Sequence, residues 1–311
     1  TIPEYDIGPD TVFHFGGLVP WCAVGSKCPV TVWREGGICL FDTRQDWLAH
    51  VLDWPVDRLF LPPSLFGKLA GIAFTQRCEA LRIYAGGGFL SFPAVRALRD
   101  RLGCKVFLNY GATEFGLRLQ GLVEHEDDVV WLPPYGDDSL EIIDDDGEEC
   151  GVGREGRLRA RLHPADPAGY DGNEEASRQF FHAGYFHTGD SAIRREDGRI
   201  RILGRAGDVI NVGGTKQAVG PIESRVSELL GVDGVCLFAQ QSSGGEEFLL
   251  VVIEGEREPD GASLEHFTAT FRQFFPHVVI RHVAEFPRRG PLRKIDRRAL
   301  LDSFRQTIRL A

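Results

Sequence analysis

Short apolar runs alternate with segments of helical spacing between residues 29 and 109. The runs predict strands at residues 30–33, 39–41, 58–61, 81–84 and 105–108, and the segments between them predict helices at 44–54, 63–72 and 92–102. Because two parallel strands need a crossover connection, which is usually a helix, this alternation is typical of βαβ units. The sequence therefore predicts an α/β fold with a parallel sheet in this part of the chain.

The pattern changes twice further along the chain. After Gly116 short strands and turns dominate, with strands predicted at 129–132, 140–143, 156–162 and 199–203. Beyond Arg205 the sequence predicts helices at 221–230 and 264–274, strands at 235–239, 248–254 and 277–283, and a last helix from Asp296. This order is that of a compact βαββαβ-like unit, so we expect two domains, at residues 1–204 and 205–311.

Charge and composition exclude several functional classes. Lys and Arg number 35 against 45 Asp and Glu, and the net charge of -10 disfavours nucleic acid as a partner. Nothing approaches eighteen consecutive apolar residues, so no membrane span is expected. The seven cysteines are odd in number and form no CxxC, which favours a reducing compartment such as the cytoplasm. The histidines form no HExxH pattern and give no support for a zinc site.

Two segments place polar groups directly after predicted strands. In the segment 84–91, YAGGGFLS, three glycines follow a strand, where they would let a ligand approach the backbone; a plain tight turn is an equal alternative. In the segment 109–116, NYGATEFG, Tyr110, Thr113 and Glu114 offer an aromatic plane, a hydroxyl and a carboxylate. Such a set can stack on a base, contact a phosphate and hold Mg²⁺, although a solvated loop is the alternative.

Three later segments are also rich in glycine or charge. They are GYFHTGD at 184–190, GRAGDVINVGG at 204–214 and PLRKIDR at 291–297. Asp190, in the first of them, could accept hydrogen bonds from a ribose diol, or could be a turn or capping residue. Lys294, in the last, lies among several arginines, so a solvated basic stretch is its alternative.

In this order and at these separations, the segments YGATE, YFHTGD, GRAGDVINVGG and LRKIDR resemble the adenylate-forming superfamily of acyl-CoA synthetases, carrier-protein adenylation domains and luciferases. The resemblance covers nearly the whole chain and includes GGGFLS. It also includes VFHFGGL at 12–18, which is similar to the family's Phe-His segment at the acyl pocket and makes His14 a pocket wall. It implies part of a large AMP-binding domain, with parallel αβ layers and a β-barrel-like part, followed by a small α+β lid domain.

The resemblance also implies a role for each motif residue. In the large domain, Gly87 and Gly88 would line the adenine edge, Tyr110 would stack on the base, Thr113 would bind the α-phosphate and Glu114 would ligate Mg²⁺.

The remaining roles fall at the junction and in the lid. Asp190 and Arg205 would hold the ribose hydroxyls, and Gly213 and Gly214 would border the pantetheine tunnel. Lys294 would reach the α-phosphate and carboxylate oxygens, where it would neutralise charge that builds in the adenylation transition state.

The sequence departs from the family pattern at three points. Family members carry, ahead of all these motifs, a Ser/Thr/Gly-rich loop ending in Lys that holds the outer phosphates of ATP, and the residues from Thr1 onward contain no such loop. Gly207 stands where an acidic or lysine hinge residue is usual, which predicts a less defined lid orientation. Arg293 stands before Lys294 where the family most often has glycine.

The leading hypothesis is an acyl-activating ligase. It would form an acyl-adenylate from a carboxylic acid and ATP, and would then pass the acyl group to CoA or to the phosphopantetheine thiol of a carrier protein. No Asp matches the position that pairs with an α-amino group in amino-acid-activating relatives, so a non-amino acid is preferred. The alternatives are a non-catalytic adenylate-binding or accessory homologue, and a split enzyme whose N-terminal half is a second polypeptide.

Overall fold

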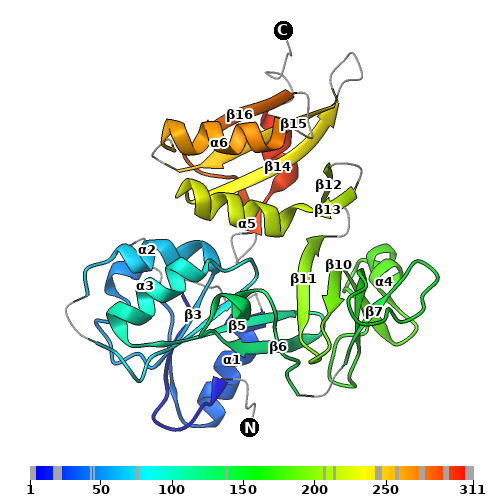
Figure 1. Cartoon of the computed structure of the whole chain (residues 1–311). Helices are drawn as coiled ribbons and strands as arrows, with labels where there is room; N and C mark the ends of the chain where they lie inside the picture. Colours follow the sequence, from blue (N-terminus) through cyan, green and yellow to red (C-terminus); the bar gives the residue numbers. More distant parts are fainter. Residues whose placement is uncertain are drawn as a thin grey trace. The chain divides into compact units, whose positions relative to one another are not determined.

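The computed structural model describes residues 5–16, 23–42, 44, 46–74, 77–136, 139–205, 208–212, 215–241, 247–255, 259–272, 277–289 and 294–304. The chain divides into two compact units, Thr1–Ile202 and Leu203–Ala311 (Figure 1). No helix in the described part of the chain is long and apolar enough to cross a membrane.

A six-stranded sheet in the order β2-β1-β3-β4-β5-β6 forms one half of the first unit. Its parallel strands are β1 (Val12–His14), β2 (Ile38–Leu40), β3 (Arg58–Leu61), β4 (Arg82–Gly86) and β5 (Lys105–Ala112). The last strand, β6 (Gly116–Leu122), runs antiparallel to β5. Between the strands lie α1 (Ala23–Arg34), the 3₁₀ turns η2 (Trp47–His50) and η3 (Pro63–Leu65), α2 (Phe66–Gly71) and α3 (Phe92–Leu102). The predicted parallel α/β layer is confirmed.

Three predicted elements of the first unit are wrong. Residues 30–33 belong to the helix α1 rather than to a strand: Val32 is fully buried, whereas Val30 and Trp33 are more than half exposed, so burial follows one face of a helix. The helix predicted over 44–54 is only the 3₁₀ turn η2. The strand predicted at 129–132 is replaced by the 3₁₀ turn η4 (Glu126–Val129), and only Leu132 keeps a strand-like bridge.

An antiparallel sheet forms the other half of the first unit. It contains β7 (Leu140–Ile143), β8 (Gly156–Arg161), β10 (Tyr185–Arg194) and β11 (Ile200–Arg205) in the order β11-β10-β8-β7, and β9 (Phe181–His182) pairs with β10 after the short helix α4 (Glu174–Phe180). One buried apolar cluster joins the two sheets, since Ala85 and Val106 of the first share it with Leu158 and Phe186 of the second. The two halves therefore pack on a common core.

The second unit has a three-stranded sheet with helices on both faces. Its elements are β12 (Val209–Val212), β13 (Thr215–Ala218), α5 (Val219–Leu230), β14 (Gly234–Gln241), β15 (Glu247–Glu254), α6 (Gly261–Arg272), β16 (His277–Val283), β17 (Arg288–Arg289), β18 (Lys294–Ile295) and α7 (Arg297–Phe304). Val226 of α5 and Phe267 of α6 pack in one apolar cluster with Leu249, whereas Leu300 of α7 packs in another with Leu250. Leu249 and Leu250 are neighbours in β15 and so point to opposite faces.

Candidate functional site

The hairpin between β5 and β6 carries three of the predicted site residues, Tyr110, Thr113 and Glu114. The strands approach so closely that a Cβ atom at Gly111 would lie 2.3 Å from the carbonyl oxygen of Gly116. The register of the strand pair shifts between Tyr110 and Gly111. Glycine at position 111 is therefore required by the close backbone approach.

A buried aromatic residue anchors the tip of this hairpin. Phe115 is 1% exposed, and its ring lies 6.0 Å from that of Tyr110 and 5.6 Å from that of Phe186 in β10. Thr113 is exposed, and its carbonyl oxygen accepts a long 3.5 Å hydrogen bond from Nζ of Lys27 in α1. The loop thus presents the hydroxyl of Thr113 from a tip that the buried Phe115 ring anchors.

Glu114 is held in place by a residue that the sequence reasoning missed. The hydroxyl of Tyr170 donates to Oε1 of Glu114 at 2.8 Å. The Tyr170 ring meets the rings of Phe180 and Phe181 edge-on, at centroid distances of 6.4 and 5.2 Å. A positioned carboxylate suits Mg²⁺, which usually binds through one or two carboxylates, water and substrate phosphates.

A bulge in β10 displaces Asp190 from the regular strand pairing. His187 pairs with Arg159 and Ser191 with Arg157, so Thr188, Gly189 and Asp190 together lie opposite Leu158. The buried Thr188 hydroxyl donates to the Leu158 carbonyl at 2.9 Å and accepts the backbone N–H of Asp190 at 3.0 Å. The bulge is therefore fixed by a buried side chain.

Asp190 and Tyr110 meet although 80 positions separate them in the sequence. The Tyr110 hydroxyl donates to Oδ2 of Asp190 at 2.7 Å. The structure thus brings together the residue predicted to stack on a base and the residue predicted to bind a ribose. A charge-assisted hydrogen bond of this length orients the carboxylate strongly.

Gly87 and Gly88 directly follow β4, which is the neighbour of β5, the strand that contains Tyr110. Gly86 pairs with Asn109 in the parallel register, and both Gly87 and Gly88 are exposed beyond it. Asn109, which the sequence reasoning did not single out, is buried with both polar atoms of its side-chain amide unpaired. Such orphaned groups are uncommon in native proteins and are often satisfied by a ligand or water.

His14 ends β1 on the same sheet. Its ring is 1% exposed, stacks on Trp47 at 5.2 Å, and accepts the backbone N–H of Gly16 at Nδ1, 3.0 Å away. Burial lowers the pKa of His14 from 6.5 to about 4, so the ring is neutral at physiological pH. A neutral, buried and stacked imidazole fits the predicted pocket wall better than a proton-transfer role.

The remaining predicted residues belong to the second unit. Arg205 ends β11 with an exposed side chain, and the exposed Lys294 pairs with Arg289 in the hairpin of β17 and β18. Gly207, Gly213, Gly214 and Arg293 lie outside the described residues.

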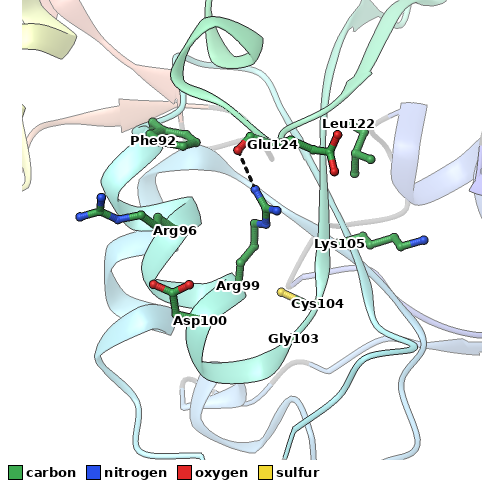
Figure 2. Close-up of a pocket in the computed structure, with 9 residues that line it drawn as sticks. All are labelled: Phe92, Arg96, Arg99, Asp100, Gly103, Cys104, Lys105, Leu122 and Glu124. Carbon is green, nitrogen blue, oxygen red and sulfur yellow. Dashed lines mark hydrogen bonds between the residues drawn. The ribbon is translucent and has the colours of Figure 1, made fainter.

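The first unit also has a surface hollow of about 490 Å³ (Figure 2). It is lined by Phe92, Arg96, Arg99, Asp100, Gly103, Cys104, Lys105, Leu122 and Glu124. Arg96 and Lys105 point away from one another, and Arg99 donates to the carbonyl oxygen of Glu124 at 3.0 Å. Its cations do not converge on a common point, and Lys105 is the first residue of β5, whereas the motif residues lie at the carboxyl end of that strand. The hollow is therefore not part of the candidate site.

The chain is similar in sequence to known ligases. No family model matches the chain. It is 32% identical over 174 residues to the 2-hydroxy-7-methoxy-5-methyl-1-naphthoate–CoA ligase of Streptomyces carzinostaticus, a match that covers 54% of this chain and 31% of that protein. It is 28% identical over 231 residues to the vibriobactin-specific 2,3-dihydroxybenzoate-AMP ligase of Vibrio cholerae, covering 71% of this chain and 42% of that protein.

The fold is shared with solved structures along nearly the whole chain. The amide bond synthetase McbA of Marinactinospora thermotolerans superposes with a TM-score of 0.80 at 22% identity, covering 97% of this chain and 64% of that one. The chain thus spans less than two thirds of the length of these relatives. The chain is thus similar in sequence to two ligases that activate carboxylic acids, and it shares its fold with an amide bond synthetase.

Proposed function

We propose that this chain acts in an acyl-activating ligase. The ligase forms an acyl-adenylate from a carboxylic acid and ATP, and then transfers the acyl group to CoA or to the phosphopantetheine thiol of a carrier protein. The observation that carries the proposal is the hydrogen bond between Tyr110 and Asp190, which joins two segments that we predict to bind the nucleotide. The two relatives named above are ligases of aromatic acids, so an aromatic acid without an α-amino group is the proposed substrate class.

In this proposal the first unit binds the nucleotide. The backbone of Gly87 and Gly88 borders the adenine, and the Tyr110 ring stacks on it. Asp190 accepts hydrogen bonds from the ribose hydroxyls, and the bond from Tyr110 keeps its carboxylate in the required orientation. Thr113 donates to the α-phosphate.

Glu114 is the proposed metal ligand of this site. Its carboxylate, held by Tyr170, suits Mg²⁺, which when bound would neutralise phosphate charge. The hydrogen bond from the Tyr170 hydroxyl to Oε1 would orient the carboxylate for the ion.

The second unit supplies the groups of the lid in this proposal. Arg205 adds a second contact to the ribose. Lys294 donates to the α-phosphate and carboxylate oxygens, where negative charge builds as the acid attacks phosphorus. After adenylation the lid turns at the junction of residues 205–208, and the backbone at Gly213 and Gly214 admits the thiol arm.

Two alternatives remain as candidate functions. A non-catalytic adenylate-binding or accessory homologue would keep Tyr110, Asp190 and Glu114 for binding alone. A split enzyme would receive the outer-phosphate contacts from a second polypeptide. In each case the free cysteines of the described residues suit a reducing compartment such as the cytoplasm.

Release of pyrophosphate from ATP tests whether this chain acts as a ligase on its own. The purified protein is incubated with ATP, Mg²⁺ and a panel of aromatic and aliphatic carboxylic acids. A ligase releases pyrophosphate only when its acid is present, and Lys294→Ala abolishes that release while AMP binding remains. AMP binding without acid-dependent pyrophosphate release would contradict ligase activity of this chain alone and would favour the accessory homologue or the split enzyme.

A further inference from the structure

A largely buried arginine begins α7, three residues after Lys294. Nη1 of Arg297 donates to both carboxylate oxygens of Glu223 in α5, at 2.7 and 2.9 Å, and Nη2 donates to the carbonyl oxygen of Leu237 in β14 at 2.7 Å. Glu223 also accepts the backbone N–H of Leu237 at 2.6 Å. The guanidinium lies over the Phe238 ring, 4.7 Å from its centroid. These contacts fix the start of α7 against α5 and the sheet.

The hairpin that carries Lys294 has a second anchor on its other strand. Arg288 in β17 pairs with Ile295 in β18 and donates through both terminal nitrogens to Glu254, with Nη2 at 2.6 Å from Oε2. Glu254 is 4% exposed and also accepts the backbone N–H of Phe286 at 2.6 Å. One arginine–glutamate pair therefore lies at the first residue of the hairpin, and the other lies two residues after its last strand.

Arg297 also contacts the segment that follows Arg205. Its Nε lies 3.3 Å from Oδ2 of Asp208, which is 38% exposed and directly precedes β12. The backbone N–H of Asp208 donates to the carbonyl oxygen of Arg205 at 2.9 Å, and the Asp208 carbonyl accepts the N–H of Val219 at 3.0 Å. One guanidinium thus contacts the junction, α5 and β14 together.

We propose that Arg297 is a positioning residue that couples the junction after Arg205 to the hairpin of Lys294, so that both turn as one rigid piece. The proposal rests on the roles proposed above for Lys294 and for the junction. The planar guanidinium reaches three acceptors in fixed directions, whereas the single ammonium of a lysine cannot keep all three contacts. The side chain would therefore set the orientation in which Lys294 enters the site when the lid turns.

Hydrogen exchange of the purified protein, followed by mass spectrometry, tests the coupling without any ligand. Asp208→Asn removes the charge of the junction contact and keeps its shape, so exchange at residues 208–212 should rise about two- to fivefold, as expected for one partly exposed ion pair. Arg297→Lys should raise exchange both there and in the hairpin. In the Asp208→Asn background it should add no further rise at the junction. Asp302→Asn is the matched control, because Asp302 pairs at 4.0 Å with Arg298, which is 92% exposed.

Three results would overturn the proposal. Unchanged exchange at residues 208–212 in Asp208→Asn would show that the contact does not restrain the junction. Additive effects of the two substitutions there would show that they act independently. A uniform rise across β14, β15 and β16 in Arg297→Lys would show a general structural role. If Arg297→Lys fails to fold, Asp208→Asn and its control still decide the first point, and none of these outcomes depends on ligase activity.

Discussion

Replacement of Gly111 by alanine should destabilise the first unit and disturb the loop that carries Thr113 and Glu114. The added Cβ would lie 2.3 Å from the carbonyl oxygen of Gly116 and 2.9 Å from Cα of Leu117. Both are backbone atoms of β6, so no side chain can rotate to make room. Because non-bonded heavy atoms need roughly 3.5 Å, the strand must move by about 1 Å. Overpacking of this kind costs about 1–3 kcal/mol.

Thermal unfolding measures this cost. For a unit the size of Thr1–Ile202, each kcal/mol lowers the melting temperature by about 2–4 °C. Gly88→Ala is the matched control, since its Cβ would meet Cγ of Pro63 at an ordinary 3.7 Å. This control should keep the melting temperature and weaken AMP binding, because Gly88 is proposed to border the adenine. An unchanged melting temperature in Gly111→Ala would refute the close approach of the two strands.

Three further predictions concern stability. Tyr170→Phe removes the 2.8 Å hydrogen bond to Glu114 and should lower the free energy of unfolding by about 1–2 kcal/mol in urea titrations; an unchanged value would show that the bond is not formed. Burial lowers the pKa of His14 from 6.5 to about 4, so the unfolded state binds more protons between these values. The free energy of unfolding should therefore fall as the pH drops from 6.5 to 4, and His14→Gln should flatten that part of the curve; an unaltered slope would contradict the assignment. Glu254→Gln leaves Arg288 buried without its carboxylate and should cost the second unit about 3–5 kcal/mol, measured by denaturant unfolding; a loss below 1 kcal/mol would show that the pair contributes little.

The sequence predicted elements well where apolar periodicity is strong. The helix at 92–102 and the strand at 277–283 were predicted with the bounds that the structure has. The segment 30–33 was mistaken for a strand because its β-branched residues favour strands locally. In the structure this segment is helical, and the helix places Val32 in the core; this packing outweighs the local strand preference.

The motifs gave the order of the candidate site residues but not their contacts. The bond between Tyr110 and Asp190 depends on a bulge in β10, and the bond between Tyr170 and Glu114 links residues 56 positions apart. Neither the register of strand pairing nor such long-range contacts can be read from local spacing. Asp190 could be a turn residue or a ribose ligand, and the structure shows that it also accepts a hydrogen bond from Tyr110. Variants at Asp190 and at Tyr110 can therefore be compared.

Calorimetry of AMP binding to the wild type, Asp190→Ala and Tyr110→Phe tests the central claim most directly. Tyr110→Phe removes the internal hydrogen bond but keeps the aromatic ring and the carboxylate, whereas Asp190→Ala also removes the ribose acceptor. AMP should bind to the wild type. Asp190→Ala should lose about 1.5–3 kcal/mol of affinity for each charge-assisted bond to the ribose, and Tyr110→Phe should lose clearly less. No binding of AMP to the wild type, or equal affinities in all three proteins, would contradict a nucleotide site at Tyr110 and Asp190.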